Sequence, residues 1–256
     1  MKTKKHISKS RYQKWQESNS EVNFGEIPRY LYHGTNDSSA MTALREGLCP
    51  RMERTGNFAH FPSNPDAVYL TDSYGPYFAA SASLKRGGCM AIMEVKTTIE
   101  MIPRFIPDED YLEQQSRRSW DLGEEFRNWD IFQKTEFFRK NAQSRFSVFW
   151  SDSLRHFGTV AHIGPIASKT ITRVAIIDVE KLAWIPSYSG SIPIALEFHK
   201  ENSARQRSLT RWIFGEGVSR KEVFGEMKLN EPGRKLLLKR DGIEIISNTC
   251  DLPYAA

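Results

Sequence analysis

The sequence predicts an α+β fold. Short apolar segments of the kind that form strands recur along the chain, with only a few helical segments between them. Two phosphate-binding motifs of parallel α/β sheets, Gly-x-Gly-x-x-Gly and the Walker loop, are both absent. These observations favour α+β over a doubly wound parallel sheet. The 256 residues suit either one large domain or one domain with a substantial appendage.

The individual strands and helices follow from local composition. The aromatic and aliphatic run 30–33 predicts a strand, and the N-cap residues 36–39 open a short helix that Gly47 ends. Further strands are expected at 67–71, 89–95, 158–163, 171–179, 192–198 and 243–246. Further helices are expected at about 76–85, within 107–146 and after residue 200, and a turn or hinge at 187–191.

Charge is unevenly spread and divides the chain. Residues 1–14 carry six Lys/Arg and no acid, and residues 200–240 carry eleven Lys/Arg against five Glu, although the whole chain carries only +5. We therefore expect a basic N-terminal arm over 1–26, a core over 27–180 with a helical insertion at about 107–150, and a basic C-terminal extension over 181–256. Such ends are typical of proteins that hold a polyanion, and equally of a solvated, solubilising surface.

The remaining composition excludes several classes of protein. Cys49, Cys89 and Cys250 fit neither a metal knuckle nor a disulfide framework, and the histidines are scattered, so we expect no metal site. No apolar run approaches the roughly 20 residues of a membrane helix. The basic N-terminus is not followed by the apolar stretch of a secretory signal. A cytoplasmic protein with no membrane partner is the expectation.

A candidate binding segment is Tyr32-His33-Gly34-Thr35, at the end of the first strand. A glycine there lets the backbone approach a ligand closely. A neutral imidazole can donate a hydrogen bond to a ribose hydroxyl or accept one from it. Thr35 adds a side-chain hydroxyl beside the histidine. Taken alone, the histidine is equally typical of a satisfied structural residue.

A second candidate segment begins with Tyr69 on the strand 67–71. Ser73 follows it, and Tyr77 lies on the next helix, whose small residues let it pack close to a sheet. The two tyrosine rings can stack on the two faces of a flat aromatic ring. The alternative is that both tyrosines belong to the core or to an interface.

Together these segments resemble a known family. LYHGT, ALREGLCPR and AVYLTDSYGPYFAASAS are similar in order and spacing to the ADP-ribosyltransferase superfamily. The likeness is to its His-Tyr branch, which includes the poly- and mono-ADP-ribosyl transferases and the tRNA 2′-phosphotransferases. The resemblance covers about residues 29–95 and extends loosely through 158–166. It implies a split, mostly antiparallel β core that binds NAD.

The resemblance also implies roles for single residues. His33 would hold a ribose, Gly34 would offer backbone hydrogen bonds to the nicotinamide amide, and Tyr69 and Tyr77 would stack the nicotinamide ring. Tyr32, Thr35 and Ser73 would line the same pocket. The reaction would break the nicotinamide glycosidic bond through an oxocarbenium-like transition state, which a nearby carboxylate would stabilise.

The sequence departs from the family at the third catalytic position. The expected Glu falls near Thr159, which would then only line the cofactor site. One interpretation takes the carboxylate from the acidic run 107–110, with Glu109 and Asp110 as candidates, although such a run also suits a helix N-terminus. Glu197 is a further candidate. Otherwise the enzyme needs no third carboxylate, or the chain binds NAD without catalysis.

The acceptor is predicted from charge and aromatic content. The segment 126–150 interleaves aromatic residues with Lys and Arg, which suits single-stranded bases, although an amphipathic helix shows the same pattern. With the basic ends, this favours RNA, or single-stranded DNA, as the acceptor. Such an enzyme would poison its own cell, so we expect a toxin or anti-phage effector with an antitoxin partner. The alternatives are a tRNA 2′-phosphotransferase-like enzyme, a protein ADP-ribosyltransferase and an inactive NAD- or RNA-binding module.

Overall fold

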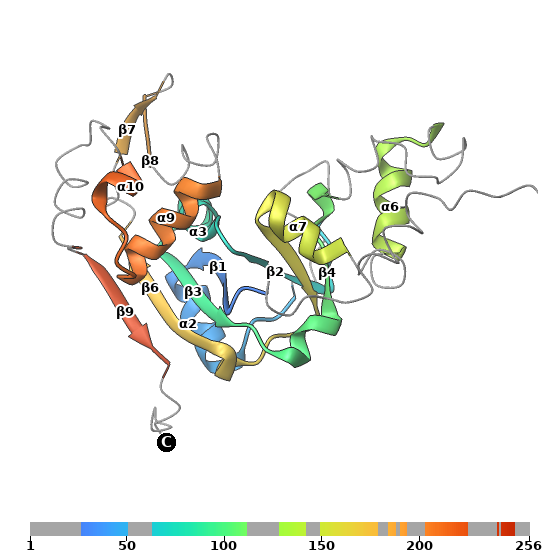
Figure 1. Ribbon diagram of the computed structural model, residues 1–256, viewed down its shortest axis with the longest axis horizontal. Coiled ribbons are helices and arrows are strands. Elements are labelled where there is room, and N and C mark those ends of the chain that lie inside the picture. The colour runs from blue at the N-terminus through green and yellow to red at the C-terminus, as the bar shows by residue number, and fades with distance from the viewer. Residues whose placement is uncertain are drawn as a thin grey trace, which may run out of the picture.

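The computed structural model in Figure 1 describes most of the predicted core and parts of both flanking regions. The described residues are 27–50, 63–111, 128–141, 149–178, 184–187, 190–193, 203–224, 240 and 242–248. The predicted N-terminal arm, Glu197 and the predicted strand beyond residue 193 lie outside them.

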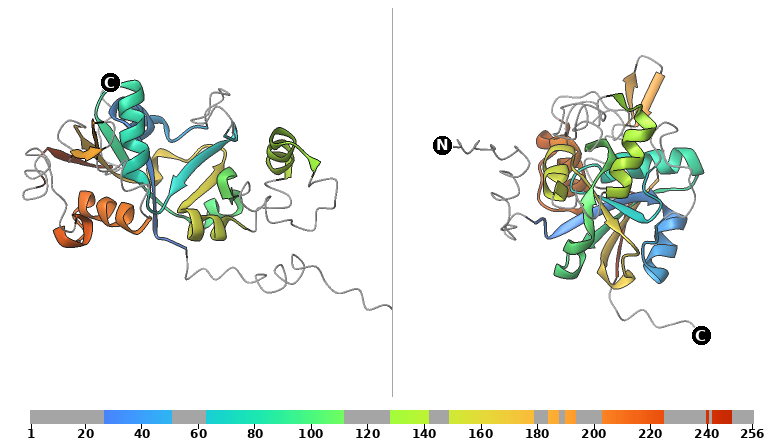
Figure 2. Two further views of the ribbon diagram at one scale, coloured as in Figure 1. Left: turned by 90° about the horizontal axis from the view of Figure 1, so that it is seen from above. Right: turned by 90° about the vertical axis from the view of Figure 1, so that its right-hand side faces the viewer.

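The fold is α+β, as predicted, and is built on a seven-stranded antiparallel sheet. In spatial order its strands are β4 (Phe105–Pro107), β5 (Thr159–Ile163), β2 (Ala67–Thr71), β1 (Tyr30–Asn36), β3 (Met90–Lys96), β6 (Ile171–Ile177) and β9 (Ile243–Ser247). A separate two-stranded sheet pairs β7 (Trp184–Ser187) with β8 (Gly190–Pro193) around the predicted turn. Figure 2 also shows β4 and β9 at opposite sides of the molecule.

Helices cover both faces of the sheet. They are α2 (Asp37–Glu46), α3 (Gly75–Arg86), α7 (Trp150–Phe157), α9 (Ser203–Phe214) and α10 (Arg220–Phe224), with 3₁₀ turns η2 (Ile99–Arg104) and η4 (Ser168–Thr170). A further helix, α6 (Ile131–Asn141), stands apart from the sheet in Figure 1. The predicted cap of the first helix is confirmed, because the side chain of Asn36 accepts a hydrogen bond from the Ser39 N–H at 3.3 Å. Gly47 ends that helix at φ +89°, and a Cβ there would lie 2.4 Å from the Ile166 carbonyl oxygen.

The sheet is split between β1 and β2. Among the described residues, the ladder that joins them contains one pair, Tyr32 with Thr71. By contrast, β1 pairs with β3 along its whole length, and so does β2 with β5. The sheet therefore has two halves, which we call the β1 half (β1, β3, β6 and β9) and the β2 half (β2, β5 and β4). This matches the split core that the resemblance implies.

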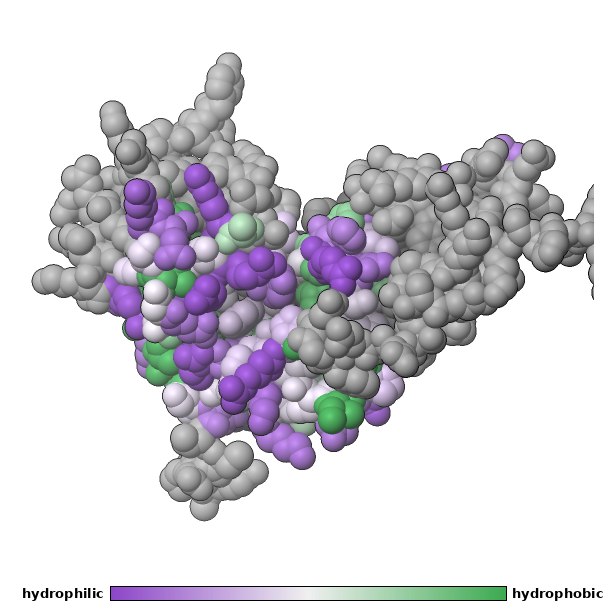
Figure 3. Space-filling model, viewed as in Figure 1, coloured by the Kyte–Doolittle hydropathy of each residue, from purple (hydrophilic) through white to green (hydrophobic). Residues whose placement is uncertain are grey.

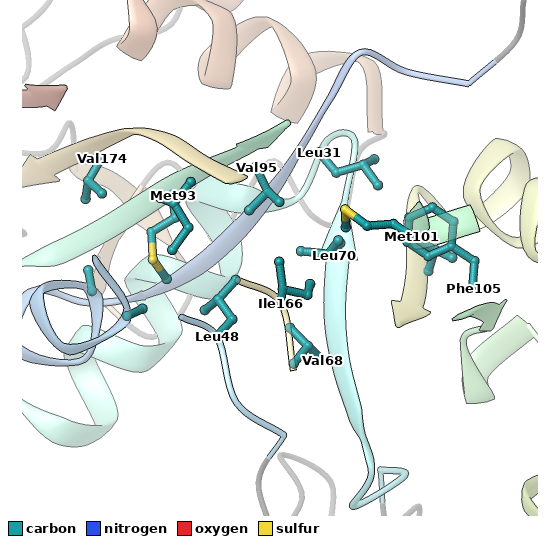
Figure 4. Packing of buried hydrophobic residues seen from close by; sticks show 14 of the residues in the cluster. Leu31, Leu48, Val68, Leu70, Met93, Val95, Met101, Phe105, Ile166 and Val174 are labelled. Carbon is teal, nitrogen blue, oxygen red and sulfur yellow. The ribbon is translucent and has the colours of Figure 1, made fainter. Parts of the chain in front are cut away.

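One hydrophobic core joins the two halves across one face of the sheet. Leu31 and Met93 of the β1 half belong to the same buried cluster as Val68, Leu70 and Phe105 of the β2 half (Figure 4). On the other face the cores are separate. One cluster lies under α3, α9 and α10 in the β1 half, and a small one surrounds Ala161 in the β2 half. On one face of the sheet the shared core therefore closes the bottom of the split, and we call this the floored face. On the other face two separate clusters lie on either side of the split.

Part of the predicted C-terminal extension belongs to the core. Strand β9 pairs with β6 from Arg173 to Ile177, so it completes the β1 half. Helix α9 buries Leu209, Ile213 and Phe214 against the same half. The boundary expected near residue 180 therefore does not divide the described residues into two cores. A local charge pattern could not reveal this, because it records composition and not strand pairing.

Candidate functional site

Gly34 presents its backbone to the split. Hydrogen bonds to the β3 side flank β1 at both ends, from the Asp37 N–H to the Cys89 carbonyl at 2.9 Å and from the Thr97 N–H to the Arg29 carbonyl at 3.0 Å. In an antiparallel ladder, successive residues direct their N–H and C=O to opposite sides. The odd-numbered residues of β1 therefore face β3. Gly34 directs both its N–H and its C=O toward β2, beyond the point where the β1–β2 ladder ends.

A side chain cannot replace the hydrogen of Gly34. A Cβ there would lie 2.4 Å from the Gly75 carbonyl oxygen, 2.5 Å from the Ala79 nitrogen and 2.8 Å from the Phe78 Cβ. Helix α3 is packed directly on the strand at this point, with Ala79 and Ala80 buried beneath it. The glycine thus lets α3 approach β1 and leaves Phe78 beside the split. Figure 3 shows the molecular surface notched between the half that carries α3 and α9 and the half that carries α7.

His33 bridges the split to β2. Its Nδ1 lies 2.8 Å from the Tyr69 carbonyl oxygen. A carbonyl can only accept, so Nδ1 carries a proton and donates it to this bond. Tyr69 directs its carbonyl toward β1 because its even-numbered neighbours on β2 bond to β5. The imidazole therefore takes the place of a ladder hydrogen bond where the strands diverge.

Tyr69 meets Glu109 on the other side of the split. The Tyr69 hydroxyl donates to Glu109 Oε1 in a short hydrogen bond. The backbone N–H of Asn64 lies 2.8 Å from the same Oε1 and 2.7 Å from the tyrosine oxygen. Glu109 is the second residue after β4 but touches β2, because β4 and β2 flank β5 in the sheet. The structure therefore brings Tyr69 and Glu109 together from positions forty residues apart.

Asp108 lies beside this pair, at the start of β5. The Asp108 N–H donates to Ser153 Oγ at 3.0 Å, and that hydroxyl donates to the Thr159 carbonyl at 2.9 Å. The Thr159 hydroxyl donates to the Asp108 carboxylate, and the Asp110 N–H does so at 2.9 Å. Thr159, where the resemblance leads one to expect an acid, thus holds an acid supplied by the neighbouring strand.

Burial sets the protonation of these groups. It raises the pKa of Asp108 to about 8, and the charges of Glu109 and Asp110 add to the rise. Burial also raises the pKa of Glu109, although the hydrogen bond from Tyr69 opposes that rise. The pKa of the Tyr69 hydroxyl is raised by burial and then by the Glu109 charge, so the phenol keeps its proton. Two carboxyls with raised pKa values beside a hydrogen-bond donor such as the Tyr69 hydroxyl are typical of a catalytic or binding site.

Other predicted residues lie away from this opening. The Tyr32 ring is buried and stacks on Phe214 at 5.5 Å, where burial raises the pKa of its hydroxyl. Thr35 is buried on the floored face, opposite Ala91. Ser73 is fully buried and donates to Asp72 Oδ1 at 2.7 Å. The side chains of these three residues are thus buried in the walls of the split.

Two further predicted residues lie beside the site, and three residues that were not predicted belong to it. The Tyr77 and Phe78 rings pack edge to face at 5.3 Å between centroids. Of the two, Phe78 is the one next to Gly34. The Asp110 side chain is exposed. Sequence reasoning did not select Phe78, Asn64 or Asp108. The acidic run pointed toward Asp108, but no motif marks Asn64, which acts through its backbone.

The predicted nucleic-acid segment is described only in part. Phe126, Arg127, Arg145 and Phe146 lie outside the described residues. Phe132 of α6 is exposed, whereas Trp129, which precedes that helix, makes an edge-to-face contact with Phe137 of α6 at 5.4 Å between ring centroids. No cluster of metal-ligating side chains occurs in the part of the chain that the structure describes, and no helix within it is long and apolar enough to cross a bilayer.

Comparison with known proteins adds little to this geometry. No protein-family model and no curated protein matches the chain. One solved structure that matches is EcPltA. It is 11% identical, the match covers 64% of this chain and 82% of that chain, and the TM-score is 0.33. A TM-score this low carries no weight, so we argue function from the residues of this chain.

Proposed function

We propose that this chain binds NAD in the split and transfers its ADP-ribose to a nucleic acid. One observation carries the proposal: Gly34 directs an N–H and a C=O into the opening between β1 and β2, between His33 and the Tyr69–Glu109 pair. An adjacent donor and acceptor on a rigid strand match a planar carboxamide such as that of nicotinamide. The sequence resemblance to the ADP-ribosyltransferases supports the same assignment.

Each residue then has a chemical role. When bound, NAD supplies the ADP-ribose and releases neutral nicotinamide. Gly34 orients the carboxamide through its backbone, and the rings of Phe78 and Tyr69 offer apolar surfaces for the nicotinamide ring. His33 accepts a hydrogen bond from a ribose hydroxyl at Nε2, while its Nδ1 stays hydrogen-bonded to the Tyr69 carbonyl. Glu109 in its charged form stabilises positive charge that develops on the ribose.

A nucleic-acid acceptor is proposed from charge. Lys and Arg contacts to phosphates supply much of the affinity of proteins for nucleic acids, and the basic residues of this chain gather near its two ends. We favour RNA, with single-stranded DNA as the second acceptor to test. Because such a reaction harms its host, we also propose a cytoplasmic toxin or anti-phage effector that a protein antitoxin restrains.

The decisive experiment incubates the protein with NAD labelled in its adenosine part and with RNA, single-stranded DNA or lysate protein in separate reactions. Nicotinamide release and label in the RNA fraction are expected, and both should weaken as salt rises. Label confined to protein would refute the nucleic-acid acceptor. ADP-ribose 1″,2″-cyclic phosphate from 2′-phosphorylated RNA would indicate a phosphotransferase, and NAD binding without any nicotinamide release would indicate a binding module.

Two substitutions test the site itself. His33→Ala removes the ribose contact, and Glu109→Gln removes the charge while preserving the shape of the side chain. Each is expected to lower nicotinamide release by about a hundredfold. Circular dichroism and the unfolding midpoint check that both variants are folded. Full activity in either variant would refute the assignment of that residue.

A further inference from the structure

Tyr69 touches the site through two chemically different groups. Its ring packs against the small cluster around Ala161, and its hydroxyl reaches Glu109. We infer that the Tyr69 hydroxyl is a positioning group, which fixes the Glu109 carboxylate in place separately from any role of the ring. This inference rests on the proposed function, because it assigns the hydroxyl a part in the same site.

The carboxylate of Glu109 is held by donors that cannot easily move away. Oε1 accepts from the Tyr69 hydroxyl and from the Asn64 N–H. Tyr69 is fixed because β2 pairs with β5 along its whole length. Asn64 is fixed by two bonds at the start of β2, from the Asp66 N–H to its Oδ1 at 3.0 Å and from the Ala67 N–H to its carbonyl at 3.2 Å. Glu109 follows β4, yet β2 determines where its charge lies.

The same hydrogen bond determines how much of Glu109 is charged. Burial and the negative charge of Asp110 favour the neutral acid and raise its pKa, while the Tyr69 hydroxyl and the backbone N–H of Asn64 favour the carboxylate and lower it. Asp108 also lies beside the pair, and the negative charge of Glu109 raises its pKa. A neutral carboxyl can neither stabilise a developing positive charge nor accept a proton. Loss of the hydroxyl should therefore reduce the active fraction of Glu109 at a given pH.

Kinetics of Tyr69→Phe separate the hydroxyl from the ring. The variant keeps the aromatic surface, so the KM for NAD should change little, while kcat should fall by about tenfold to a hundredfold. The acidic limb of the pH profile should move to higher pH, since the Glu109 pKa rises when a donor is lost. Tyr30→Phe is the matched control, because Tyr30 opens β1 at the end remote from the split. A raised KM with unchanged kcat would overturn the inference.

A double-mutant cycle tests whether Tyr69 acts through Glu109. If it does, Tyr69→Phe should add no further loss of kcat once Glu109→Gln is present. Multiplying effects would mean that the hydroxyl contacts the substrate directly, and the inference would fail. The starting rate in this cycle is nicotinamide release by the unaltered protein, so its absence would count against the proposed function alone.

A measurement without catalysis keeps the inference independent of activity. Carbon-13 NMR of the glutamate carboxyls, with Glu109 assigned from the Glu109→Gln spectrum, gives the pKa of Glu109 directly. It should be higher in Tyr69→Phe than in the unaltered protein and unchanged in Tyr30→Phe. An equal pKa in all three proteins would refute the proposed role of the hydroxyl, whatever reaction the protein performs.

Discussion

Gly34 is crowded on the side of α3 and open along the strand edge that faces β2. Its neighbours across the packed side are mainly backbone atoms of a helix, at 2.4 and 2.5 Å from a hypothetical Cβ. Backbone atoms can give way only if the helix moves. The residue is therefore required by helix packing whether or not a ligand uses its peptide groups, and this explains why a small residue alone is weak evidence for a binding site.

Gly34→Ala should destabilise the protein by about 1–3 kcal/mol, because the added methyl forces α3 away from β1. Urea unfolding measures the loss. Gly75→Ala is the control, since a Cβ there would meet side-chain atoms at longer distances, 3.1 Å from Ile92 Cγ2 and 3.3 Å from Tyr32 Cβ, and no backbone atom closer than these. Equal losses in the two variants would mean that α3 is free to shift at this point.

Asp108 should make stability depend on pH. Its pKa is raised to about 8 in the folded protein, whereas an unfolded chain releases the same proton near pH 4. The folded state therefore binds more protons than the unfolded state between these values, and stability contributed by this group falls as pH rises from 4 to 8. Asp108→Asn keeps an acceptor for Thr159 and Asp110 but cannot ionise. Its stability relative to the unaltered protein should increase from pH 5 to pH 8, measured by urea unfolding at both.

The sequence could identify the residues that adjoin the split but not the contacts between them. His33, Gly34 and Tyr69 were selected from short local patterns, and the acidic run supplied Glu109 as one candidate. The hydrogen bond that joins Tyr69 to Glu109 depends on β4 and β2 flanking β5, which no local pattern encodes. Asn64 takes part through a main-chain N–H that every residue except proline carries, so its identity gave no signal.

At the scale of elements, α9 is the helix that a sequence reading places least well. Its basic residues suggested that it belongs to a C-terminal extension. It packs instead on the β1 half, and ion pairs lie at two places along this contact. Arg207 bonds to Asp72 at 2.7 Å on an exposed surface. Beyond its C-terminal end, Arg173 of β6 joins buried Glu94 to Glu216 and lies over the Phe214 ring at 4.8 Å. Strands and helices near the N-terminus were easier to predict, because capping and alternation are local signals.

The two regions should differ in energy. Arg173→Met leaves Glu94, which is 1% exposed, without its cation, and should cost about 3–5 kcal/mol of unfolding free energy. Arg207→Ala breaks an exposed pair and should cost less than about 1 kcal/mol. Urea unfolding of both variants compares them. If Arg207→Ala proved the more costly, the exposed pair, and not the buried cluster, would hold α9 in place.

At the scale of the molecule, the split is a break in hydrogen bonding within an otherwise continuous sheet. The Gly34 N–H points into it, whereas the His33 and Thr35 peptide groups face β3. Hydrogen exchange by NMR should therefore be faster at the Gly34 amide than at those of its two neighbours. Added NAD should slow exchange at Gly34 if its carboxamide binds there. Slow exchange at Gly34 without any ligand would show that the opening is closed in solution.

The path of the chain through the two halves governs when the site can exist. The polypeptide runs from β1 to β2, returns to β3, crosses to β4 and β5, and returns again to β6 and β9. Neither half is a continuous stretch, so no single cleavage can liberate one of them intact. On the ribosome, the strand that flanks β3 emerges only with Ile171–Ile177 and the final strand later still. A nascent chain therefore lacks a finished β1 half until Ile243–Ser247 has emerged, so the two walls of the split come together only after all seven strands have been made.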